Sequence, residues 1–293
     1  MKLYCWRGET RNFGDELNVL LWPRLLPGLF DEDESALFLG IGSVLDARHP
    51  PGVIKLVAGA GYGGYQPPAT LDQTWRIHWV RGPRTARLLG LPASRGAGDP
   101  AMLLPVAGWR AEAKGSAIAF MPHFESLRHG AWHEATARAG TALIDPRGDP
   151  ADIIAAIGRS RLLLTEAMHG AIVADALRVP WVALRPLSAA HRAKWLDWAG
   201  ALDLTITFQP LAASSLSEWL FTSRWATFLR GYNLLRRAKP ALDRCLFIDA
   251  AANALLHAAC APPQLSTEGA LDRCQTRMQE HLHALRRDPF HVT

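Results

Sequence analysis

The stretch TEAMHGAIVADAL, residues 165–177, joins a strand pattern to a helix pattern. The apolar run at 162–164 predicts a buried strand, and the apolar spacing within the stretch itself predicts a helix. His169 and Gly170 therefore lie at a strand-to-helix junction. Free backbone N–H groups and the helix dipole favour a bound anion at such a junction, and a histidine can move a proton beside it. The stretch predicts an α/β fold with a site for a small anionic substrate.

Short apolar runs alternate with helical patterns along most of the chain, which is the βαβ rhythm of parallel sheets. The first half offers strands at 2–6, 36–39, 54–58 and 77–80, and the second half at 117–121, 142–144, 161–165, 181–184 and 204–208. Helical patterns lie between most of them, for example at 16–25, 85–89 and 149–157. From residue 214 onward the pattern is helical.

A break in the pattern divides the chain. Residues 105–116 contain a proline, two glycines and mixed charges without a strong period. We therefore expect two Rossmann-like domains that face each other across a cleft, at 1–107 and 108–213, followed by helices at 214–293.

Composition bounds the class of protein. The 293 residues suffice for two α/β domains, and the net charge of +5 favours anionic partners such as phosphorylated metabolites or an anionic membrane face. No basic stripe with interleaved aromatic residues repeats along the chain, so no nucleic acid partner is expected.

The cysteines and the apolar runs bear on compartment. The four cysteines are widely spread without a CxxC pair, which favours reduced thiols and argues against a zinc site. The N-terminus is too polar for a signal peptide, and no apolar run reaches the length of a membrane span. We expect a cytoplasmic protein, and peripheral contact with the inner face of the cell membrane stays open.

The glycine-rich run GAGYGG, residues 59–64, fits the G-x-G-x-x-G pattern after a strand. Pro67 and Pro68 block the helix that a dinucleotide site needs, and no acidic residue stands about 20 residues downstream. The run is therefore either a structural turn or a loop, around Gly61 and Tyr62, that lets a substrate approach the backbone.

The run NFGDELN, residues 12–18, leaves the first strand and enters a helix. Asn12 or Asp15 can cap that helix. The alternative is that these side chains bind a sugar hydroxyl.

The run VRGPRTARLLGLP, residues 80–92, puts Arg81 and Arg84 just after a strand, with a helix that begins near Pro83. Two guanidinium groups beside a helix N-terminus can hold a carboxylate or phosphate in a bidentate way. The alternative is a pair of surface arginines in weak salt bridges.

Other polar residues have simpler interpretations. His123 ends a strand and Asp99 lies in a turn, and each alone is more often structural than catalytic. His129, His133 and Glu134 have a helical spacing that suggests a metal, but a solvated helix face explains them better.

Together these motifs resemble the polysaccharide pyruvyl transferase family. The matching runs stand in the family's order: NFGDELN, FLGIGSVL (38–45), GAGYGG, VRGPRT, GDPAML, MPHF and EAMHGAIVADALRVP. The likeness covers residues 1–187 and is greatest to the branch of succinoglycan biosynthesis ketolases and ketal-pyruvate transferases.

The resemblance implies a function and a fold. The family transfers pyruvate from phosphoenolpyruvate to a sugar of an exopolysaccharide or cell-wall glycan, and its fold is similar to the two-domain GT-B glycosyltransferases. Neither a metal nor a redox cofactor nor ATP is implied. Residues 1–107 would serve the acceptor side and 108–213 the donor side.

The resemblance also implies roles for residues. His169 matches the family's catalytic histidine, and Ala167 and Met168 stand where an arginine and a leucine often precede it. Arg81 matches the family's VR-type arginine. Glu166 could activate the acceptor hydroxyl, or be a buried or capping acid. The full expected set is, for catalysis, His169 and Glu166, for the donor, Arg81, Arg84, Gly170 and His123, and for the acceptor, Asn12, Asp15, Gly61 and Tyr62.

Two other classes compete with this interpretation, a glycosyltransferase that uses nucleotide sugars and a non-catalytic glycan-binding protein. Residues 219–244 also carry aromatic and basic side chains in an amphipathic pattern. Such a helix either lies in a membrane interface, near a lipid-linked acceptor, or packs on the domains.

Overall fold

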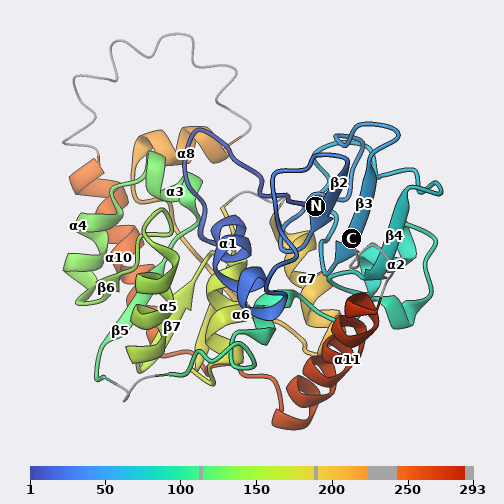
Figure 1. The fold of residues 1–293 in the computed structure, drawn as a ribbon. Helices are drawn as coiled ribbons and strands as arrows, with labels where there is room; N and C mark the ends of the chain where they lie inside the picture. The colour runs from blue at the N-terminus through green and yellow to red at the C-terminus, as the bar shows by residue number, and fades with distance from the viewer. Residues whose placement is uncertain (112–114, 188–190, 224–242, 288–293) are drawn as a thin grey trace.

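The computed structural model describes residues 1–111, 115–187, 191–223 and 243–287, and contains two parallel sheets (Figure 1). The first sheet has the order β1-β2-β3-β4, and the second has the order β6-β5-β7-β8-β9. All neighbouring strands are parallel. The expected α/β class is confirmed.

The strands are β1 (Lys2–Leu3), β2 (Ala36–Leu39), β3 (Ile54–Ala58), β4 (Trp75–Trp79), β5 (Ile118–Met121), β6 (Ala142–Leu143), β7 (Leu162–Thr165), β8 (Trp181–Leu184) and β9 (Phe208–Gln209). The helices of the first 213 residues are α1 (Phe13–Leu25), α2 (Pro83–Leu88), η1 (Ala93–Arg95), η2 (Pro100–Leu103), α3 (Phe124–His129), α4 (Trp132–Ala139), α5 (Pro150–Arg159), α6 (Met168–Ala176) and α7 (Arg192–Ala201).

Every expected strand has a counterpart, and β2, β3 and β8 have the expected bounds. All four residues of β2, β7 and β8 are buried, which is why these strands read as continuous apolar runs. The strands β1, β6 and β9 stand at sheet edges and are shorter than expected. The expected helix at 16–25 begins three residues earlier, at Phe13.

The largest apolar cluster draws on both sheets and on the C-terminal helix. It includes Trp22 of α1, Trp79 of β4, Trp181 of β8 and Met278 of α11 (Glu268–Arg286). Helices of the first half pack on helices of the second, α1 on α5 and η2 on α6. The C-terminal helix α11 packs on β4 of the first half. Figure 1 shows the second sheet at left, the first at right, and α11 below the first. The halves therefore share one core.

Asp197 makes a buried set of polar contacts between the two halves. Asp197 of α7 accepts hydrogen bonds from Arg81 Nε (3.1 Å), from the backbone N–H groups of Arg84 and Thr85 (3.0 Å each), and from the Thr85 hydroxyl (2.5 Å). The N-cap residue of α2, Gly82, has no side chain, so Asp197 supplies the capping carboxylate from the other half of the chain. A Cβ on Gly82 would overlap the Asp197 backbone carbonyl, so glycine permits this close approach.

In the described part beyond residue 213, the named elements are all helical, as expected: α8 (Leu216–Thr222), η5 (Asp243–Ile248), α10 (Asp249–Ala259) and α11. The amphipathic segment 219–244 lies mostly outside the described residues. Trp219 and Phe221 on α8 are exposed. Among the described residues, no helix has both the length and the apolar character needed to cross a membrane.

The buried pair predicts a large stability effect. Replacement Asp197→Ala leaves the Arg81 guanidinium buried without its counter-ion, so we expect a loss of about 3–5 kcal/mol in the free energy of unfolding. Urea unfolding followed by circular dichroism measures it. The control is Glu34→Ala, which removes an exposed partner of Lys2 and should leave the midpoint almost unchanged. An Asp197→Ala protein as stable as this control would contradict the role given to the pair.

Candidate functional site

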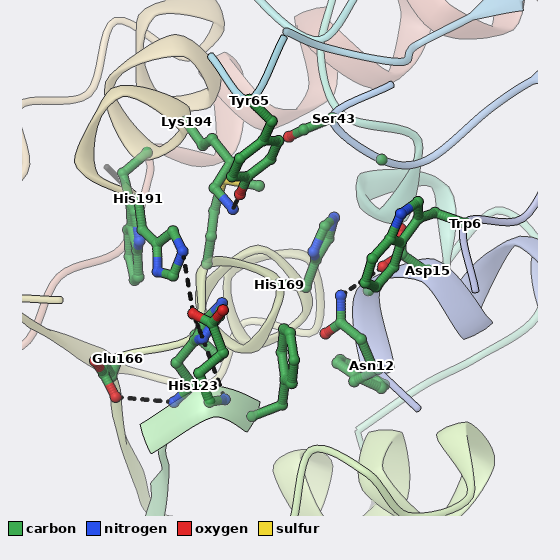
Figure 2. Close-up of a pocket in the computed structure, with 18 of the residues that line it drawn as sticks. Trp6, Asn12, Asp15, Ser43, Tyr65, His123, Glu166, His169, His191 and Lys194 are labelled. Carbon is green, nitrogen blue, oxygen red and sulfur yellow. Dashed lines mark hydrogen bonds and ion pairs between the residues drawn. The ribbon is translucent and has the colours of Figure 1, made fainter. Parts of the chain in front are cut away.

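A cavity of about 330 Å³ lies where the carboxyl ends of strands from both sheets meet (Figure 2). Its walls come from the loop before α1 and the start of α1, the loop after β2, the β5–α3 and β7–α6 junctions, and the start of α7. The polar and charged side chains that line it are Asn12, Asp15, Ser43, Arg48, Tyr65, His123, Glu125, Glu166, His169, His191 and Lys194.

His169 occupies the junction that the sequence indicated. It stands in the first turn of α6, directly after β7, and its side chain is 14% exposed, toward the cavity. Ala167 and Met168 line the cavity beside it. The N-terminal end of α6 thus opens on the cavity, where the helix dipole favours an anion.

A buried carboxylate lies behind His169. Asp99 is the N-cap of η2, and its Oδ1 accepts a hydrogen bond from the Ala101 N–H at 3.0 Å. Its Oδ2 lies 3.5 Å from His169 Nε2. Asp99 Oδ2 and His169 Nε2 are both buried, and neither has a hydrogen-bond partner among the described residues. Asp99 thus has the expected structural role through Oδ1, which caps η2, while its Oδ2 faces the imidazole of His169.

The start of α1 forms the wall facing His169. Asn12 and Asp15 do not cap α1 with their side chains; instead Asn12 Nδ2 donates to Asp15 Oδ2 at 2.6 Å. Burial raises the pKa of the Asp15 carboxyl, although the Asn12 hydrogen bond and the nearby His169 act in the opposite direction. Gly14 between them packs so closely on the imidazole that a Cβ there would overlap it.

Glu166 lines the cavity, but its carboxylate already has three donors. Its Oε2 accepts from the His123 N–H (2.9 Å), and its Oε1 accepts from the Ser126 hydroxyl (3.0 Å) and the Leu187 N–H (2.9 Å). This matches the alternative of a buried structural acid, which ties the loop after β8 to the start of α3.

The expected arginine clamp is not supported by the geometry. The Arg81 guanidinium is fully buried, and each of its three nitrogens donates a hydrogen bond, to Asp197, to the Ser43 hydroxyl and to the Tyr62 carbonyl. The exposed Arg84 touches Asp197 only through its backbone N–H. Neither arginine lines the cavity.

Three other expected residues lie outside the cavity wall. Gly61 packs on the Arg81 guanidinium, and Tyr62 donates its hydroxyl to the Gln66 carbonyl. Gly170 packs on Thr165 and Met121, beneath His169. The glycine loop at 59–64 therefore fits its structural alternative.

Two histidines and one glutamate lie together on the wall opposite Asn12. His123 is the N-cap of α3, Glu125 lies in the first turn of α3, and His191 precedes α7. Glu125 Oε2 lies 3.3 Å from His123 Nδ1 and 3.4 Å from His191 Nε2. Burial, and then the neighbouring His123, lower the pKa of His191 to about 2, so its ring is neutral.

Sequence reasoning missed three residues that line the cavity, Glu125, His191 and Lys194. His191 and Lys194 follow a segment without a recognised motif, and both line the cavity at the start of α7. Glu125 was visible two residues after His123. His129 stacks on Phe221, and the group of possible metal ligands that the described residues form is His123, Glu125 and His191.

Comparisons with known proteins agree with the family that the sequence motifs resemble. The family model "Polysaccharide pyruvyl transferase" matches residues 69–188. The "Succinoglycan biosynthesis protein ExoV" of Rhizobium meliloti is 35% identical over 317 residues, covering 99% of this chain and 100% of that protein. No solved structure matches the chain significantly.

The matched region contains His169 and Asp99 together with β5, β7 and α6, and the likeness to the curated relative extends over nearly the full chain, including α1. This chain therefore belongs to the polysaccharide pyruvyl transferase family and is a pyruvyltransferase.

Proposed function

We propose that this chain transfers pyruvate from phosphoenolpyruvate to a sugar of an exopolysaccharide or its lipid-linked precursor, forms a cyclic ketal and releases phosphate. The observation that carries the proposal is His169, which is presented to a cavity at a helix N-terminus and backed by the buried Asp99. Family membership supplies the reaction class.

The donor is held by cations of the cavity wall in this proposal. Phosphoenolpyruvate carries a carboxylate and a phosphate around an enol carbon. Lys194 lines the cavity, and its ammonium donates to the Tyr65 hydroxyl at 2.7 Å. Since Arg81 is committed to Asp197, Lys194 and the N-terminal end of α6 take the place of the arginine clamp.

His169 is the proton donor in this proposal. A tautomer whose Nε2–H points at Asp99 leaves Nδ1 to exchange a proton, and Asp99 stabilises the imidazolium. Protonation of the methylene carbon makes C2 of the donor electrophilic. One sugar hydroxyl attacks C2 and gives up its proton. A second hydroxyl then displaces phosphate, closes the ketal and passes its proton to the departing phosphate.

Asp15, oriented by Asn12, takes the acceptor's proton in place of the saturated Glu166. Figure 2 shows Asn12 and Asp15 on one side of His169, and His191 and Lys194 on the other. This separation supports an acceptor side at 1–107 and a donor side at 108–213, in a GT-B-like arrangement. The proposed location is cytoplasmic, with membrane contact through the lipid-linked acceptor.

A direct assay tests the function against its rivals. We expect release of inorganic phosphate from phosphoenolpyruvate only when an oligosaccharide acceptor is present, and a product whose mass equals the acceptor plus a pyruvate ketal. Transfer from a nucleotide sugar, or binding of glycan without turnover of phosphoenolpyruvate, would overturn the proposal.

The role of His169 predicts a loss of turnover. His169→Gln should lower kcat by about 10²–10⁴-fold, the usual effect of removing a general acid, while phosphoenolpyruvate still binds by calorimetry. The exposed His257→Gln is the matched control and should keep full activity. A folded His169→Gln protein with the control's kcat would exclude the histidine as proton donor.

The revised donor site predicts different effects for two cations. Lys194→Met should raise the KM for phosphoenolpyruvate about tenfold to a hundredfold, because a charged hydrogen bond is lost. Arg84→Met should leave the KM unchanged, since its side chain lies outside the cavity. The reverse pattern in steady-state kinetics would restore the arginine clamp.

A further inference from the structure

Three ligand-type side chains converge on one wall of the cavity. His123 Nδ1 and His191 Nε2 lie 3.3 Å and 3.4 Å from the same oxygen, Glu125 Oε2. The three ligand atoms all lie within 4.8 Å of one another, and the centroids of the two imidazole rings are 4.1 Å apart. Figure 2 shows His123 and His191 on the side of the cavity away from Asn12 and Asp15. We call His123, Glu125 and His191 the His–Glu–His cluster.

The separations fit a metal's coordination shell. Donor atoms 2.0–2.1 Å from a tetrahedral zinc ion are about 3.3 Å apart, which is the spacing from Glu125 Oε2 to each imidazole nitrogen. Two imidazoles and one carboxylate are also ligand types that first-row transition metals accept.

The charge of the cluster favours a cation over an anion. A phosphate placed between the two histidines would meet the Glu125 carboxylate. His191 is 6% exposed, and its Nδ1 is buried without a hydrogen-bond partner among the described residues. Its polar contact is therefore made through Nε2, on the side of Glu125.

The backbone holds the three ligands in place before any ion binds. The His123 N–H donates to Glu166, and His123 Nδ1 accepts a 3.4 Å hydrogen bond from the Glu125 N–H in the first turn of α3, a contact that an ion bound at Nδ1 replaces. His191 is the N-cap residue of α7, whose Asp197 is fixed by Arg81 and the N-terminus of α2. Such preorganisation lowers the cost of binding an ion.

We propose that His123 Nδ1, Glu125 Oε2 and His191 Nε2 bind a divalent first-row transition-metal ion, such as Zn²⁺. All three residues line the cavity, so the remaining coordination positions face it. Three protein ligands with an open position are typical of a metal that takes a further oxygen ligand from water or a bound molecule. An anionic oxygen of the cavity's ligand can fill that position.

Metal titration tests the site without any assay of transfer. The full chain, stripped of metal with a chelator, is titrated with Co²⁺ and followed by visible absorption, and with Zn²⁺ by calorimetry. We expect one equivalent of tightly bound metal. Glu125→Gln and His191→Gln should each weaken binding by more than about 100-fold, beyond the usual effect of removing an outer hydrogen-bond partner.

His133→Gln, which changes an exposed histidine on α4, is the matched control and should bind as the unaltered chain does. Glu125 is one-third exposed, so Glu125→Gln decides the matter if His191→Gln fails to fold. An unaltered chain that takes up no metal, or a Glu125→Gln protein with unchanged affinity, would overturn the proposal. Loss of transfer activity in any variant would not, because binding is measured directly.

Discussion

The buried pair of Arg81 and Asp197 is the constraint on which the site depends. A guanidinium with no exposed surface is costly to bury unless its charge is paired and its N–H groups have acceptors. Asp197 supplies the charge, and Ser43 and Tyr62 supply further acceptors. The same carboxylate caps α2, so one residue of the second half fixes two features of the first.

This pairing sets the position of α7. The N-terminal end of α7 places His191 and Lys194 at the cavity. The remaining hydrogen bonds of Arg81, to Ser43 and Tyr62, hold the loops after β2 and β3. The cavity is therefore assembled only when both sheets are packed together, which agrees with the single apolar cluster that joins them. On this account Arg81 contributes to function by positioning rather than by contact with a donor.

The fold was largely predictable because buried parallel strands leave a local signal. The runs at 36–39, 54–58 and 181–184 are continuous and apolar, and the strands have those bounds. The sequence predicts a strand at 204–208, whereas the edge strand β9 forms only at Phe208–Gln209, where it pairs with β8. His169 was predictable for a similar reason, because a strand end and a helix start are both local features.

The rest of the site depends on partners far away in sequence. Nothing near Arg81 reveals that Asp197 satisfies it, and nothing near Asp99 reveals that one of its oxygens faces His169. Glu166 was visible beside His169, but its three donors come from other loops. Sequence reasoning identified polar residues such as His169 and Glu166, whereas packing brings in His191 and Lys194 and determines which atoms are left without a partner.

The central claim is that an acid in this cavity protonates the donor's methylene carbon during pyruvyl transfer. The most direct measurement is the reaction of the unaltered chain with phosphoenolpyruvate and an oligosaccharide acceptor in heavy water, followed by NMR and mass spectrometry. The account predicts phosphate and ketal in equal amounts, with a single deuterium in each ketal methyl group. A ketal methyl without deuterium, or consumption of phosphoenolpyruvate that leaves the acceptor unmodified, would contradict it.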